Sequence, residues 1–453
     1  MTEKKLYYQE IYKTLKRQDR EAFRDLFLKL HEQDQVEVFH LLYPENKTKI
    51  TYMLTAQEFA ELFERLDYDD QWEAVQYLPK GFLQEVFTYV ADDEVARFIR
   101  QIDDPDLSQE TLAGMKAVDR QAIEKILTHQ VDSAGSIMTT ELVTVSEEAT
   151  VEEAIHTLRQ IGRQAETIYY IYVIDSKERL AGVLSIRDLL FAKPDAKMKD
   201  ISNSQIVAVD VETDQEEVAR LIKDYDLLAL PVTDSYHHLL GIVTVDDIMD
   251  VIDEEATEDF HRFAGISVSD EEGDEPDTII GMTKSRLPWI LILIFMGMIS
   301  ANLIGMFEET LSKVVALAAF MPIIMDSAGN VGTQALAVSV RRITLGNADD
   351  VSFWKMLWNE FCSGFLIGLA SSLSIGLIAY FLYGNWVLSF IIGASLLVTL
   401  SISTVIGYVV PALFNKIGID PAVASGPFIT TINDACGLMI YFSLATYLLH
   451  HLQ

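Results

Sequence analysis

The chain has 453 residues, half of them hydrophobic, and carries 35 basic and 68 acidic side chains. Residues 282–453 hold seven basic and eight acidic residues, which leaves 28 basic and 60 acidic ones, a net charge of about −32, in residues 1–281. Such a surface excludes nucleic acid and anionic lipid as partners and favours cations, although an acidic surface that serves only solubility has the same composition. The two cysteines, Cys362 and Cys436, support neither a disulfide framework nor a thiolate metal site.

Residues 1–130 are predicted to form an N-terminal helical domain. In this region apolar residues recur at helical spacing and are interrupted about every dozen residues by Asp, Pro or Gly. Phe63, Val75, Phe87 and Phe98 repeat at nearly that interval. The pattern is typical of a small helical solenoid whose aromatic residues form the core.

Residues 131–252 contain an internal repeat in a strand–helix pattern. "LAGVLSIRDLL" (180–190) matches "LLGIVTVDDIM" (239–249), "TVEEAIHTL" matches "DQEEVARLI", and "IYVID" matches "LPVTD". Each copy has a helix, an apolar strand, a turn, a strand that ends in Ser or Thr, and an Asp that opens the next helix. This order resembles a pair of CBS domains, a Bateman module. The resemblance implies that ATP or another adenosine nucleotide could bind there, with Asp188 and Asp247 holding ribose.

Residues 253–281 form an acidic connector, a plug helix followed by a linker. The helical pattern starts a few residues earlier, and it places these apolar residues on one face: Ile248, Val251, Ile252, Ala256 and Phe260. Acidic residues occupy the rest of the helix. Because like charges at this spacing repel, the helix either binds cations or is simply solvated.

Residues 282–453 are predicted to form a transmembrane domain of five helices. The expected spans are 287–307, 314–340, 360–383, 386–410 and 426–449, each near or above the ~20 residues that a bilayer requires. Basic residues precede the first span and lie between the second and third and between the fourth and fifth. The positive-inside rule then places the amino terminus in the cytoplasm and the carboxyl terminus outside. The start of the chain has no signal-peptide pattern, which agrees with this topology.

The last predicted span contains one full charge, in "TTINDACG" at Asp434. An ionised carboxylate inside a bilayer costs several kcal/mol and usually faces a polar cavity or a partner. No Arg or Lys lies deep in any predicted span. Asp434 is therefore either protonated within a helix bundle or a ligand for a transported cation.

A second polar stretch, "MPIIMDSAGNVGTQ", lies in the second predicted span. Pro322 frees a backbone carbonyl, and Asp326, Asn330 and Gln334 follow on one helix face. All these candidate ligands are oxygen atoms, which favours a hard cation over zinc or copper. Mg²⁺ keeps much of its water and needs only one or two carboxylates, and a pore on a dimer axis would supply two.

The combination of regions resembles the MgtE magnesium channels over the whole chain, through "IVTVDDIMDVIDEEATED", "PIIMDSAGNVGTQ" and "IDPAVASGPFITTINDACGLMIYF". The resemblance implies a homodimeric Mg²⁺ channel of the bacterial inner membrane that closes when its cytosolic domains bind Mg²⁺. It implies Asp434 and the Thr430 carbonyl as pore ligands. The implied regulatory ligands are Glu61, Asp93, Asp214, Glu216, Asp226, Asp247, Asp250, Glu255, Glu258, Asp259 and Asp420.

The predicted fold class is a multidomain membrane protein with an all-α N-terminal domain, α/β tandem CBS domains, a connecting helix and five transmembrane helices. An enzyme is rejected because neither the G-x-G-D motif of aspartyl intramembrane proteases nor the H-E-x-x-H motif of metalloproteases occurs. The alternative that stays open is a CBS-regulated transporter of another divalent cation, such as Co²⁺ or Mn²⁺.

Overall fold

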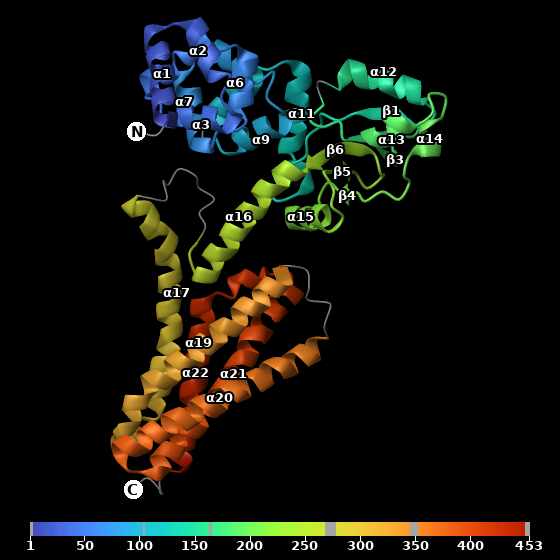
Figure 1. Cartoon of the computed structure of the whole chain (residues 1–453). Helices are drawn as coiled ribbons and strands as arrows, with labels where there is room; N and C mark the ends of the chain where they lie inside the picture. Colours follow the sequence, from blue (N-terminus) through green and yellow to red (C-terminus); the bar gives the residue numbers. More distant parts are fainter. Residues whose placement is uncertain (1–2, 103–104, 163–164, 268–277, 345–351, 449–453) are drawn as a thin grey trace. The chain divides into compact units, whose positions relative to one another are not determined.

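A computed structural model describes residues 3–102, 105–162, 165–267, 278–344 and 352–448 (Figure 1). The chain divides into two compact units, Met1–Asp253 and Glu254–Gln453, and each is described by itself. The division falls inside one helix, α16 (Val245–Ala264).

The first part of the N-terminal unit is entirely helical, as predicted. Its helices are α1 (Glu3–Arg17), α2 (Arg20–Phe27), α3 (Glu32–His40), α4 (Pro44–Lys47), α5 (Ile50–Met53), α6 (Ala56–Phe63), α7 (Tyr68–Tyr77), α8 (Lys80–Val86), α9 (Asp92–Arg100), α10 (Pro105–Ala113) and α11 (Ala117–Leu127). Phe63, Phe87 and Phe98 are buried and contact one another through their rings, with centroids 5.5 to 6.1 Å apart. Val75 packs against the same core but is only partly buried.

Two three-stranded sheets follow, and they confirm the internal repeat. The first consists of β1 (Thr144–Ser146), β2 (Tyr170–Ile174) and β3 (Leu180–Ser185), and the second of β4 (Val209–Asp210), β5 (Ala229–Thr233) and β6 (Leu239–Thr244). In each sheet the first pair of strands is parallel and the second antiparallel. The register shifts at the same place in both copies, Val173/Ile174 and Val232/Thr233. The helices are α12 (Val151–Ile161), α13 (Ile186–Phe191), α14 (Met198–Ile201) and α15 (Gln215–Asp224).

Only the first part of the connector helix has a buried apolar face. In α16, Ile248 and Val251 are buried in the second CBS copy, whereas Ile252 and Phe260 are exposed. The predicted apolar stripe is therefore buried only at its start. Residues 268–277 of the predicted linker lie outside the described part of the chain.

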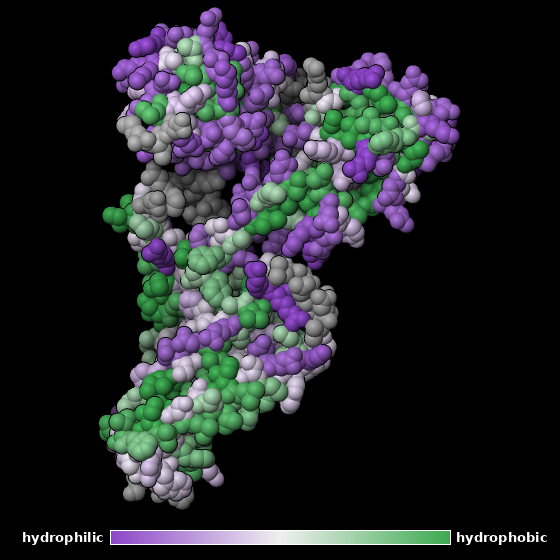
Figure 2. Space-filling view, in the orientation of Figure 1, coloured by the Kyte–Doolittle hydropathy of each residue, from purple (hydrophilic) through white to green (hydrophobic). Residues whose placement is uncertain are grey.

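The second unit contains five long helices: α17 (Ile279–Met306), α19 (Ala316–Thr344), α20 (Phe353–Tyr383), α21 (Trp386–Lys416) and α22 (Gly426–Tyr447). Two short elements, α18 (Glu308–Lys313) and η2 (Pro421–Val423), precede α19 and α22. By length and composition, α17, α20, α21 and α22 qualify as membrane spans among the described residues. The second predicted span, 314–340, corresponds to α19, which is 29 residues long but polar near its middle. Figure 2 shows hydrophobic surface spread over these helices, whereas hydrophilic side chains cover much of the first unit.

Helices α19, α21 and α22 pack closely through glycines. A Cβ atom at Gly332 in α19 would lie 1.9 Å from Asn433 Nδ2 in α22, and one at Gly407 in α21 would lie 2.3 Å from the Gly332 carbonyl oxygen. A larger residue at either position would push two helices apart. This packing buries Asn433 completely, directly beside Asp434 in the sequence.

Candidate metal sites

Three carboxylates meet in the first unit at the start of two helices. Asp93 and Glu94 lie in the first turn of α9, and Asp247 lies in the first turn of α16. Acidic residues suit helix N-termini because the helix dipole is positive there. One carboxylate oxygen from each residue lies within 4.8 Å of the others. This spacing allows a single cation to contact all three.

This acidic cluster, Asp93, Glu94 and Asp247, is short of compensating positive charge. Asp93 is 8% exposed, and its Oδ1 atom has no hydrogen-bond partner among the described residues. Burial, and then the neighbouring Asp247, raise the pKa of Asp93 well above its ordinary value. Burial likewise raises the pKa of Glu94 to about 7.

Glu166 and Arg97 lie beside the cluster and change the net charge of the region. Burial raises the pKa of Glu166 to about 7, and the charge of Asp247 adds to this rise. Arg97 pairs with Glu94 and lies 3.7 Å from Asp250. One guanidinium cannot neutralise this group of carboxylates, so a divalent cation would relieve their repulsion.

The structure thus brings together Asp93 and Asp247, two of the residues that the resemblance implied. Glu61 is exposed and lies outside this group. Glu64, the C-cap residue of α6, contacts the start of α9 instead. Its Oε1 atom accepts a hydrogen bond from Ala91 N at 2.9 Å. Glu94 and Glu166 were missed. The run "ADDE" at a helix start was a weak signal for Glu94, and nothing in the sequence marked Glu166.

The predicted residues of the second CBS copy do not join this group. Asp214 caps α15 and accepts a hydrogen bond from Glu216 N at 2.8 Å. Asp226 lies exposed in the turn after that helix, with a positive φ of 52°. Asp214, Glu216 and Asp226 form no three-ligand group among the described residues, and their assignment as metal ligands stays a prediction.

Within the second unit, the end of α16 meets the turn before α22 through an arginine. Arg262 donates to both Glu258 and Asp420. Asp420 Oδ1 also caps η2 by accepting from Ala422 N at 2.7 Å. Arg262, which sequence reasoning missed, therefore occupies the place between two predicted metal ligands.

Two further predicted ligands lie nearby on α16. Asp259 accepts a hydrogen bond from Thr344 Oγ1 at 3.4 Å, and its pKa is raised by burial and by the charge of Asp420. Glu255 lies one turn before Asp259 on the same helix. The end of the connector helix thus gathers carboxylates around a single guanidinium.

Asp434 lies in the third turn of α22, and its Oδ1 atom is buried without a hydrogen-bond partner among the described residues. The other charge that acts on it is that of Asp326 in α19. Thr430, one turn earlier, donates its hydroxyl to the Gly426 carbonyl at 2.9 Å. The polar stretches of α19 and α22 thus place two like charges close together, an arrangement that a cation would stabilise.

Comparison with known proteins first defines the class. Residues 321–444 match the family profile "Divalent cation transporter", residues 134–195 and 198–254 match CBS domains, and residues 6–102 and 30–132 match the "MgtE intracellular N domain". The chain therefore has the sequence organisation of a divalent cation transporter with CBS domains.

Individual relatives cover the whole chain. It is 36% identical over 448 residues to the magnesium transporter MgtE of Enterococcus faecalis, which covers 97% of each chain. It is 35% identical over 430 residues to the corresponding transporter of Bacillus subtilis, or 95% of this chain and 94% of that one. The chain belongs to the MgtE family. This confirms the resemblance and the predicted fold class, and it agrees with the rejection of an enzyme.

A solved structure matches the first unit. It is described as the cytosolic domain of the Mg²⁺ channel MgtE in complex with ATP, and it aligns with a TM-score of 0.51 and 38% identity. The alignment covers 54% of this chain and 99% of that chain.

Proposed function

We propose that this chain transports Mg²⁺ across the membrane along a path that contains Asp434. The observation that carries the proposal is the buried carboxylate oxygen of Asp434 in an apolar helix, which has no hydrogen-bond partner among the described residues and lies within electrostatic range of a second carboxylate, Asp326. Membership of a family whose curated relatives are magnesium transporters supports the same ion. Oxygen-only ligands suit Mg²⁺, while Co²⁺ and Mn²⁺ remain the competing cargoes.

The acidic cluster in the first unit is proposed as a sensor of internal Mg²⁺. Burial, and after it the charge of neighbouring carboxylates, raises the pKa values of Asp93, Glu94 and Asp247, so their ionised forms are unfavourable without a bound cation. Bound Mg²⁺ would favour the conformation in which α9 and α16 lie together. This conformation can close the pore only if it binds Mg²⁺ more tightly than the open one.

The proposed assembly is a homodimer with Asp434 of each copy near the pore axis. The proposed location is the bacterial inner membrane, with the first unit in the cytoplasm and the carboxyl terminus outside. The relative described as a cytosolic domain, which matches the first unit, supports the cytoplasmic side.

Adenosine nucleotide binding is proposed at Asp188 rather than at Asp247. Asp188 is exposed, and its Oδ2 atom accepts a hydrogen bond from Ser185 Oγ at 2.6 Å. Asp247 accepts the equivalent hydrogen bond from Thr244 Oγ1, but it is partly buried and lies beside Asp93 and Glu94. The related cytosolic domain that was solved with ATP motivates a binding test with the variant Asp188→Ala.

Growth rescue of a strain that lacks its own Mg²⁺ uptake tests the transport function. Wild type is expected to restore growth at low Mg²⁺, and Asp434→Ala is expected to reduce uptake at least tenfold at equal expression. Glu309→Ala is the matched control, because Glu309 is 83% exposed and pairs with Lys313 in the short helix α18, outside the long helices. Rescue by Asp434→Ala equal to wild type would refute the pore role. Uptake of Co²⁺ or Mn²⁺ in preference to Mg²⁺ would favour the alternative cargo.

A further inference from the structure

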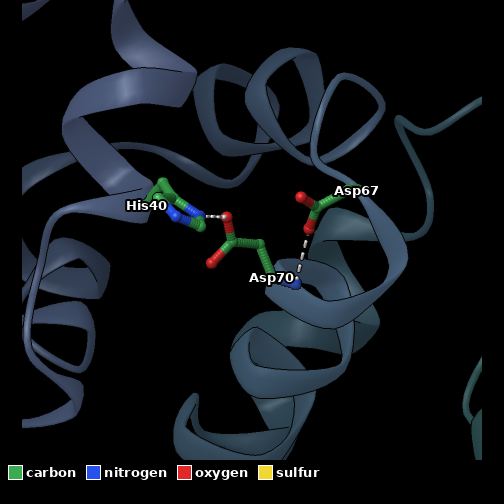
Figure 3. Close-up of side chains that lie close together, drawn as sticks. All are labelled: His40, Asp67 and Asp70. Carbon is green, nitrogen blue, oxygen red and sulfur yellow. Dashed lines mark hydrogen bonds and ion pairs between the residues drawn. The ribbon is translucent and has the colours of Figure 1, made fainter. Parts of the chain in front are cut away.

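A cluster with a histidine lies in the helical domain, apart from the sites described above. His40 ends α3, and Asp67 and Asp70 lie at the start of α7 (Figure 3). The His40 Nδ1 atom lies 2.8 Å from Asp70 Oδ2, and one ligand atom from each of the three residues lies within 4.8 Å of the others. We propose that His40, Asp67 and Asp70 form a binding site for a transition-metal dication of the Zn²⁺ class.

At and beneath this site, three carboxylates stand against one lysine ammonium. The remaining negative charge equals the positive charge that a dication would supply. Lys47 is 1% exposed and donates to Asp70 Oδ1 at 2.7 Å and also to Glu73. Asp70 and Glu73 thus share one buried ammonium, and the exposed Asp67 adds a further negative charge beside them. Lys47 holds Oδ1 of Asp70 from the buried side, and Oδ2 pairs with His40 Nδ1, so a bound ion would take the place of that hydrogen bond.

The ligand atoms are exposed on the side where an ion would enter. His40 is exposed, with 66% of its side chain accessible, and Asp67 is exposed at the helix N-cap. Asp67 uses only Oδ1 for the cap, accepting from Asp70 N at 2.9 Å. Figure 3 shows the His40 ring and the Asp70 carboxylate directed toward each other, with Asp67 at the N-cap that precedes Asp70. His40 and Asp67 are exposed and can rotate toward the buried Asp70, and zinc requires its ligands at ~2.0–2.2 Å.

The histidine decides which ion would bind. Mg²⁺ prefers oxygen ligands and retains its water, whereas imidazole favours Zn²⁺ and other first-row metals. The ion would join the end of α3 to the start of α7. This site does not depend on the transport function, because its ligands belong to the helical domain alone.

The test is Zn²⁺ binding to the full-length, detergent-purified chain by isothermal titration in excess Mg²⁺, which occupies oxygen-only sites. Co²⁺ in place of Zn²⁺ gives a visible absorption band that reports ligand geometry. His40→Gln and Asp67→Asn are the test variants, and Asn preserves the N-cap of α7. His31→Gln and Asp69→Asn are the controls, since both residues are exposed on the same two elements.

We expect Zn²⁺ to bind wild type and both controls, and we expect each test variant to weaken that binding at least tenfold and to lose the Co²⁺ band. Equal Zn²⁺ affinity in His40→Gln and wild type would overturn the proposal, as would the absence of Zn²⁺ binding to wild type. Loss of transport in Asp434→Ala leaves this result unaffected, so the two proposals fail separately.

Discussion

Asp70 and Asp93 are two buried aspartates of the same helical domain, and they are compensated in different ways. Asp70 is 5% exposed and is held by Lys47 at 2.7 Å and His40 at 2.8 Å. Asp93 is 8% exposed, lies beside Glu94 and Asp247, and has one oxygen without a hydrogen-bond partner in the part of the chain that the structure describes. A carboxylate with a built-in cation holds the fold together, whereas one surrounded by other carboxylates needs a proton or an outside cation.

The largest effect is expected from a substitution of Lys47, because it removes the cation that distinguishes Asp70 from Asp93. Lys47→Met would leave Asp70 and Glu73 without their ammonium, and loss of one partner of a buried pair costs about 3–5 kcal/mol. We expect that loss in the free energy of unfolding, measured by denaturant titration of the full chain. Lys29→Met is the control, because the Lys29–Asp25 pair is exposed and screened by solvent. An equal effect of the two variants would show that Lys47 does not compensate the buried carboxylates.

The pH dependence of stability should show that the acidic cluster lacks its own cation. With the folded pKa of Glu94 near 7 and an unfolded value of 4.5, the folded state retains a proton that the unfolded chain has released. Stability therefore falls as pH rises from about 4.5 to about 7. Relative to Glu94→Gln, wild type should lose about 3 kcal/mol over this interval without Mg²⁺. Parallel pH curves for the two proteins would contradict this, and saturating Mg²⁺ should reduce the difference.

Asp93→Asn should change the free energy of unfolding in the opposite direction to Lys47→Met. Removing a buried carboxylate from a group of like charges should stabilise the Mg²⁺-free protein by about 1 kcal/mol. The same change should remove much of the stabilisation that Mg²⁺ provides. Thermal unfolding with EDTA and with Mg²⁺ measures both effects, and Asp25→Asn, at an exposed position, is the control. Destabilisation in EDTA would mean that Asp93 is already compensated within the fold.

The smallest effect is expected at Arg262, whose guanidinium lies among predicted Mg²⁺ ligands. Arg262→Gln removes the partner of Glu258 and Asp420, so these carboxylates should bind Mg²⁺ more tightly. If Mg²⁺ closes the channel there, half-inhibition of currents should need about fivefold less internal Mg²⁺, equivalent to about 1 kcal/mol. Arg262→Lys keeps the charge and should stay near wild type. An unchanged Mg²⁺ response in Arg262→Gln would exclude this competition.

Local patterns predicted most of the fold. The repeated "GVLSIRDLL" and "GIVTVDDIM" stretches gave two sheets of the same order with the same register shift, because alternation and turn residues act over short distances. Helical periodicity likewise identified Phe63, Phe87 and Phe98 as core. Periodicity failed on α16, where Ile252 and Phe260 are exposed, since a stripe is buried only where another element covers it.

The sequence by itself determined the chain's charge separation, its repeats, its long helices and the presence of one carboxylate in the last span. Only the tertiary structure decided the partners of each charge. It placed Asp247 beside Asp93 and Glu94, Arg262 against Asp420, and His40 against Asp70. These contacts join residues 30 to 158 positions apart, and their electrostatic energy depends on distance and burial in the folded chain. Residue type showed which side chains could bind a cation, and the fold decided which of them already have one.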